Sequence, residues 1–131
     1  MSDPQEELVH YRMERAWETL DEARLMFSSN HLHGAANRLY YACFYAVCAL
    51  LAHYEMSSSK HGGVMSLFNQ HFVKEGVVSN SYGKFYSKLF NSRTEGDYGD
   101  MLSEIEISKD DLVGAEKFIT TIRELIYPVK S

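Results

Sequence analysis

The residues best suited to chemistry lie in the stretch RTEGDYGD, which begins at Arg93. Arg93 and Asp97 are four residues apart, so on a helix they share one face and can form an ion pair. Asp97 can then hold the guanidinium and leave its outer edge for a phosphate. Tyr98 adds a phenol that can stack on a base, and Gly96 and Gly99 let the backbone leave helical geometry. The plainer interpretation is a surface ion pair at a helix end, worth about 0.3 kcal/mol.

Three further candidates for binding an anion lie earlier in the chain, at Arg38, Lys60 and His61. Arg38 precedes a long apolar run, and arginine is rarely buried without a partner. It is either an anion contact in a cleft or half of an internal ion pair with a carboxylate of the acidic last third of the chain. The residues alone favour the ion pair. Lys60 and His61 stand side by side at a predicted helix start, and we expect them, with Arg38, near the Arg93 stretch.

The six histidines form no pattern that is typical of a metal centre. The sequence has no HExxH motif, no CxxC pair and no paired Glu-x-x-His of a di-iron bundle, so we expect neither a metal nor a cofactor. A nucleophile elbow, a P-loop and a GxGxxG motif are also absent. His61-Gly62-Gly63 resembles a glycine-rich loop only superficially, because no Lys-Ser/Thr pair follows it to hold a phosphate and a metal.

The charge of the chain changes sign along its length. The net charge is −5, from 13 basic and 18 acidic residues. Residues 1–30 carry a net charge of −4, residues 31–93 carry +4, and residues 94–131 carry −5. A chain this acidic overall is a poor general nucleic-acid binder. Its positive middle segment can still line a local anion site.

The cysteines and the N-terminus predict a cytoplasmic protein. Cys43 and Cys48 would point about 140° apart on a helix, so they cannot bridge each other, and buried free thiols fit a reducing compartment. The N-terminal residues are acidic and lack the apolar segment of a signal peptide. The run Leu39–Tyr54 is too short and too polar to span a bilayer, so we expect no membrane association.

The spacing of apolar residues predicts an all-α fold in a single domain over residues 1–131. Apolar residues make up 45% of the chain and charged residues 24%, as in ordinary globular domains. Helices are expected from Pro4 (capped by Asp3) to Phe27, from after Gly34 to about Tyr54, over Lys60–Lys74, around Phe85–Arg93 with fraying through Gly96 and Gly99, and from Ser108 to near Pro128, with Val77–Gly83 as a connection.

The second of these helices is apolar on nearly every side from Leu39 to Leu51. Such a helix is normally central in a bundle or covered by a second subunit. We therefore expect an antiparallel bundle of four long helices plus a short fifth element, with the second helix at its centre, and a homodimer.

Four segments, in this order, resemble the HEPN family, the higher eukaryotes and prokaryotes nucleotide-binding domain. They are Arg12–Phe27, the run AANRLYYACFYA from Ala35, the run SKHGGV from Ser59, and Arg93 followed by Asp97-Tyr98-Gly99-Asp100. The similarity covers the chain from about Leu8 to Tyr127. It implies a bundle of four long helices plus a short one, usually as a homodimer.

The resemblance also implies two competing functions. Many HEPN members are metal-independent endoribonucleases, often toxins encoded beside an MNT-type minimal nucleotidyltransferase antitoxin, and others are RNA- or nucleotide-binding modules without catalysis. The ribonuclease signature is an arginine, four to six residues, and a histidine. Arg93 matches the arginine, but Tyr98 stands where the histidine is expected, and His61 is the one substitute. Because a phenol with a pKa of about 10 is a poor acid or base at neutral pH, the resemblance favours the binding module, with the endoribonuclease as the alternative.

Overall fold

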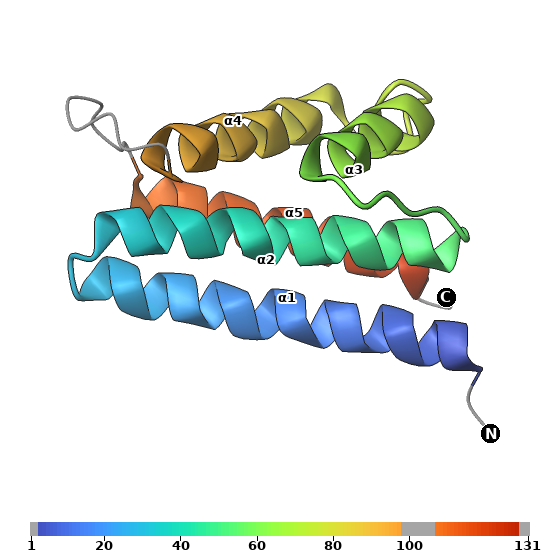
Figure 1. The fold of residues 1–131 in the computed structure, drawn as a ribbon, viewed down its shortest axis with the longest axis horizontal. Coiled ribbons are helices and arrows are strands. Elements are labelled where there is room, and N and C mark those ends of the chain that lie inside the picture. Colours follow the sequence, from blue (N-terminus) through green and yellow to red (C-terminus); the bar gives the residue numbers. More distant parts are fainter. Residues whose placement is uncertain (1–2, 98–106, 129–131) are drawn as a thin grey trace.

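The computed structural model describes residues 3–97 and 107–128, apart from the side chains of residues 93–97. Every regular element in these ranges is helical, which confirms the all-α expectation. The elements in chain order are α1 (Pro4–Ser28), α2 (Leu32–His53), α3 (His61–Phe68), the π-helical turn η1 (Asn69–Val73), α4 (Asn80–Asp97) and α5 (Lys109–Ile126). Figure 1 shows α1 along one side of α2, and α4 and α5 on its other sides.

Two of the predicted helix starts are confirmed by their caps. Asp3 accepts a hydrogen bond from the backbone N–H of Gln5 at 3.1 Å, and Pro4 occupies the first position of α1. At α5, the backbone N–H of Ser108 donates to Asp111 Oδ2 at 3.0 Å. Such contacts satisfy backbone groups that a helix start leaves without intrahelical partners.

Two other helices begin earlier than the sequence predicts, and each of them takes in a glycine. In α2, a Cβ on Gly34 would lie 2.8 Å from Met26 Sδ of α1. In α4, a Cβ on Gly83 would lie 3.0 Å from Val73 Cγ1 of η1. Both glycines therefore allow a close approach between neighbouring elements, and neither of them serves a turn.

The predicted third helix is divided between α3 and the π-helical turn η1, so its regular α-helical part is shorter than expected. Gly76 follows this region with a left-handed φ of 78°, a backbone conformation that glycine adopts readily.

Helix α2 is the central element, as its apolar surface predicts. It packs against α1, α3, α4 and α5. Its buried residues are Ala35, Ala36, Leu39, Tyr40, Ala42, Cys43, Ala46, Val47, Ala49, Leu50, Leu51 and Ala52. Cys43 is buried, Cys48 is half-buried, and both thiols are free, as predicted.

The length argument against a membrane span is wrong, because α2 begins seven residues before Leu39. With 22 residues, α2 is long and apolar enough to cross a membrane by length and composition. However, 67% of its most apolar window is buried inside the fold, which is typical of a core helix.

Candidate functional site

His61, the first residue of α3, is held against aromatic side chains of α2. Its Nδ1 lies 2.8 Å from the hydroxyl oxygen of the fully buried Tyr40. Its ring stacks on Phe44, with centroids 4.4 Å apart, and meets the edge of Tyr41 at 5.6 Å. We call Tyr40, Tyr41, Phe44 and His61 the His61 cluster. Because Tyr40 engages Nδ1, a proton exchanged between His61 and a ligand would pass through Nε2.

Helix α4 joins the other side of this cluster. The ring of Tyr40 stacks on Tyr86 and meets the edge of Phe90, with both centroid distances at 6.0 Å. Helices α2 and α4 run in opposite directions (Figure 1), so α4 continues from Phe90 toward the first turns of α2. Arg93 follows Phe90 by three residues, so its backbone lies about 4.5 Å beyond that of Phe90 along the axis of α4.

Two elements that carry predicted site residues meet at Tyr40. His61 of α3 and Phe90 of α4, three residues before Arg93, both contact the ring of Tyr40. The backbone of Asp97 belongs to the last turn of α4. The side chains of Arg93 and Asp97, and the whole of Tyr98, lie outside the described residues, so their clustering stays a prediction.

Among the described residues, Arg38 pairs with a carboxylate of α1 and with none of the last third of the chain. Arg38 Nε lies 3.5 Å from Glu22 Oε1 of α1, and both side chains are more than 40% exposed. The two helices follow each other with a short connection, so the first turns of α2 face the last turns of α1. The pair is exposed and not internal, and a pair this exposed contributes at most about 1 kcal/mol.

Lys60 is exposed and immediately precedes the His61 cluster. Its backbone N–H donates to Ser58 Oγ at 3.3 Å, which fixes the chain at the start of α3. The hydrogen bond therefore holds the backbone of Lys60, from which its ammonium group extends, next to His61.

Two arginines of α1 were missed by reasoning from the sequence. Arg12 Nη1 donates to the carbonyl oxygen of Cys48 at 3.3 Å. The guanidinium of Arg15 lies 5.4 Å from the ring centre of Tyr45, and hydrogen bonds to Glu18 and Tyr45 raise the pKa of Arg15. The sequence signal for these contacts is a stripe on α2. Positions 38, 41, 45 and 48 follow helical spacing and lie on one face of that helix.

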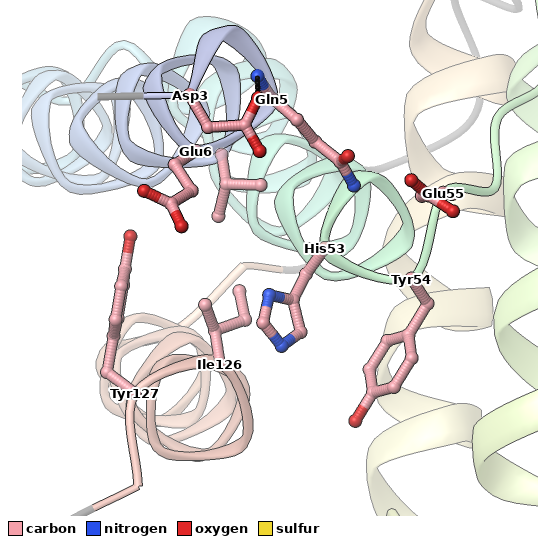
Figure 2. Close-up of a pocket in the computed structure, with 9 residues that line it drawn as sticks. Asp3, Gln5, Glu6, His53, Tyr54, Glu55, Ile126 and Tyr127 are labelled. Atoms are coloured by element: carbon pink, nitrogen blue, oxygen red, sulfur yellow. Dashed lines mark hydrogen bonds between the residues drawn. The ribbon is translucent and has the colours of Figure 1, made fainter. Parts of the chain in front are cut away.

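A first hollow, the acidic end pocket, lies where α1 begins and where α2 and α5 end (Figure 2). It has a volume of about 760 Å³ and is lined by Asp3, Gln5, Glu6, Val9, His53, Tyr54, Glu55, Ile126 and Tyr127. Gln5 closes one side by donating from Nε2 to the carbonyl oxygen of Ala52 at 2.6 Å. In Figure 2 the carboxylate of Glu6 points toward the hydroxyl of Tyr127.

A second hollow, the polar groove, lies between η1 and α4. It has a volume of about 440 Å³ and is lined by Asn69, Val73, Asn80, Gly83, Lys84, Ser87, Lys88 and Asn91. Neither hollow includes His61. Within residues 3–97 and 107–128, no group of three or more metal-binding side chains comes together.

A family model described as "HEPN domain" matches residues 9–131. A Thermotoga maritima protein named "UPF0332 protein" is 45% identical over 126 residues, which cover 95% of this chain and 96% of that protein. Two Methanocaldococcus jannaschii proteins, each named "Putative toxin", are 32% and 30% identical. The first match covers 92% of this chain and 90% of the relative, and the second covers 76% and 65%. The chain therefore belongs to the HEPN family.

Proposed function

We propose that this chain is a toxin-like HEPN module that binds RNA or a nucleotide between the His61 cluster and the last turns of α4. The observation that carries the proposal is the 2.8 Å contact between Tyr40 and His61. The ring of Tyr40 also meets Phe90 of α4, which precedes Arg93 by three residues. The contact between Tyr40 and His61 supports the proposal because it orients the imidazole of His61, and Arg93 is the residue that matches the arginine of the family signature.

Each group in this region has a role in binding a nucleotide. The half-buried rings of Tyr41 and Phe44 offer surfaces on which a base can stack. Arg93 supplies a guanidinium for phosphate, and its planar fork allows two parallel hydrogen bonds. Asp97 and Tyr98 would complete the site by orienting Arg93 and by contacting the base. Arg38 and Lys60 would add positive charge at its edges.

We further propose that a second copy of the chain completes the site as a dimer cleft. Tyr41 and Tyr45 form a half-buried stripe on α2, and Arg15 stacks beside it from α1. The same face of α1 carries Tyr11 and Leu25, which are 60% and 68% exposed. Light scattering at micromolar concentration should report twice the mass of one chain, and a monomer would contradict the dimer.

The protein partner in this proposal is an MNT-type minimal nucleotidyltransferase in a toxin–antitoxin pair. The toxin name of two relatives supports it. The neighbouring open reading frame should encode such a protein, and the two products should copurify. Copurification from a strain that expresses both chains tests this partner directly.

A second candidate function is a metal-independent endoribonuclease, favoured by the hydrogen-bonded imidazole of His61. In that reaction the 2′-hydroxyl attacks the adjacent phosphorus, a base removes its proton, and the 5′-oxygen leaves with a proton from an acid. His61 would exchange the protons, Arg93 would stabilise the charge on phosphorus, and Tyr98 would assist as a proton donor. The products would carry 2′,3′-cyclic phosphate ends.

The test measures the affinity of labelled single-stranded RNA and of ATP by fluorescence anisotropy. Arg93→Ala should weaken binding on the order of tenfold, and Arg93→Lys should recover only part of it because the planar fork is lost. Tyr98→Phe separates stacking from hydrogen bonding, since only the hydroxyl disappears. Lys117→Gln on α5 is the matched control. Affinity that does not change in Arg93→Ala would end the proposal.

Growth of cells that express the chain alone separates the two functions. An endoribonuclease should arrest growth, and both Arg93→Ala and His61→Ala should relieve the arrest. A binding module should leave growth unchanged while it retains RNA affinity in vitro.

A further inference from the structure

The polar groove between η1 and α4 has the chemistry of an anion-binding surface. Two lysines, three asparagines and a serine line it, and no carboxylate does. Lys84 is exposed and makes no ion pair within the part of the chain that the structure describes. Lys88 pairs with Asp111 at 3.1 Å, yet its side chain remains 55% exposed. Ammonium and amide groups both donate hydrogen bonds to phosphate oxygens.

The shape of the groove depends on a close contact between its two walls. A Cβ on Gly83 would lie 3.0 and 3.2 Å from the two methyl carbons of Val73, and 3.5 Å from Asn69 Oδ1. Gly83 therefore lets α4 approach η1 closely enough to form the floor of the groove. The π-helical turn places Asn69 and Val73 at this floor, and π-helical turns often occur at functional sites.

The spacing of the lysines fits a strand that runs along the axis of α4. Lys84 and Lys88 are four residues apart, so they share one face and are separated by about 6 Å along the helix. This is close to the spacing of successive phosphates on a nucleic-acid strand. Asn80 and Asn91 extend the same face in both directions.

The groove leads to the region of the His61 cluster. Ser87, which lines the groove, donates its hydroxyl hydrogen to Met65 Sδ of α3 at 3.6 Å. Met65 follows His61 by four residues, so both lie on one face of α3. At its other end, the groove reaches Asn91, four residues beyond Ser87 on the same face of α4. A ligand that leaves the His61 cluster past Met65 would therefore enter the groove beside Ser87.

We propose that the polar groove binds the phosphate backbone of a single-stranded RNA, one of whose neighbouring nucleotides occupies the site at the His61 cluster. This inference rests on the proposed RNA-binding function and deepens it. Lys84 and Lys88 contact two successive phosphates, and the asparagines and Ser87 donate to their oxygens. Two of the six basic residues of the positive middle segment, Lys84 and Lys88, thus lie together on this surface.

The test compares a labelled RNA trinucleotide with a labelled dodecamer over a range of salt concentrations. Lys84→Gln/Lys88→Gln should weaken dodecamer binding on the order of tenfold and leave trinucleotide binding within about twofold. The slope of log affinity against log salt should fall by about 1.4, because each phosphate contact on a single strand contributes about 0.7. Lys117→Gln/Arg123→Gln removes the same charge from α5 and should leave the slope unchanged.

Two results distinguish the failure of this inference from that of the proposed function. Wild-type protein that binds neither oligonucleotide would overturn both. Wild-type protein that binds both, with dodecamer affinity and salt slope equal in the groove variant and the α5 control, would overturn the groove alone. The double variant removes the Lys88–Asp111 pair and could therefore be unstable. Lys84→Gln by itself keeps this pair, and it should produce half of the change in salt slope.

Discussion

Compared with the polar groove, the acidic end pocket is larger and carries the opposite charge. Its lining includes Asp3, Glu6 and Glu55 and has no lysine or arginine, whereas the groove has two lysines and no carboxylate. The two hollows share no residue. The net charge of −5 therefore describes neither surface, and nucleic-acid binding depends on how the charges are separated in space.

The difference between the hollows follows in part from the order of charges in the sequence. The acidic end pocket takes two of its carboxylates, Asp3 and Glu6, from the acidic first thirty residues and a third, Glu55, from just after α2. The groove uses only η1 and α4, which come from the positive middle segment. The two hollows therefore lie on different elements of the fold.

The largest expected effect is that of Leu50→Ala, which should disrupt both hollows together. Leu50 is fully buried in α2, so its truncation leaves a cavity and should lower the free energy of unfolding by about 2–5 kcal/mol. Urea denaturation followed by circular dichroism measures it. Val77→Ala is the control, because Val77 is 50% exposed and should change stability by less than about 0.5 kcal/mol. Equal losses in both variants would contradict the buried position of Leu50.

Gly83→Ala should affect the groove and spare the acidic end pocket. The added methyl group meets Val73, and relieving this contact should cost about 1–3 kcal/mol of stability. Gly62→Ala is the matched control, because no atom lies within 4 Å of a Cβ there, and it should stabilise the protein by about 0.5–1 kcal/mol. A stabilising Gly83→Ala would show that α4 and η1 are not in close contact.

The helix boundaries show how much of this arrangement can be predicted from sequence. Asp3 and Ser108 were recognised because a cap is a local pattern, and the central position of α2 followed from its apolar residues alone. Gly34 and Gly83 were misread as breaks because their role is close packing with Met26 and Val73. That role depends on tertiary contacts, which residue spacing does not reveal.

The candidate site shows the same limit. His61 and Arg93 were predicted from residue type and family resemblance, yet the contact of His61 with Tyr40 required the fold. The ion pair of Arg38 with Glu22 of α1 was not predicted, since it depends on which helix α2 meets. The two hollows were not predicted, because their walls come from segments far apart in the sequence or from both sides of a turn.

A smaller effect is expected at high pH, from the thiols of the core that both hollows share. Burial raises the pKa of Cys48 from 9.0 to about 11, an effect that the nearby Arg12 charge opposes, and burial also raises the pKa of Cys43. The unfolded chain therefore loses thiol protons at lower pH than the folded chain. Stability should be complete below pH 9 and should fall as the pH rises toward about 11.

Cys48→Ala removes one of these titrating groups and should flatten the dependence. The measurement is the free energy of unfolding at several pH values between neutral and alkaline. A pH dependence as steep as that of the wild type would show that Cys48 titrates equally in the folded and unfolded chains.

The smallest effect is expected from Glu6→Gln/Glu55→Gln, which neutralises part of the acidic end pocket. RNA affinity should rise by less than about twofold at physiological salt, because solvent-exposed charges are screened over about 8 Å. Anisotropy with the labelled dodecamer measures it. A tenfold loss of affinity would mean that RNA uses this pocket, and the contrast between the two hollows would then have no bearing on RNA binding.

The most direct test of the account is to map bound RNA by photo-crosslinking with 4-thiouridine oligonucleotides, followed by mass spectrometry of the peptides. If RNA binds at the His61 cluster and the polar groove, we expect crosslinks within Tyr40–Phe44, in α3 from His61 onward and along α4. Crosslinks confined to Pro4–Val9 and His53–Glu55, at the acidic end pocket, would contradict it.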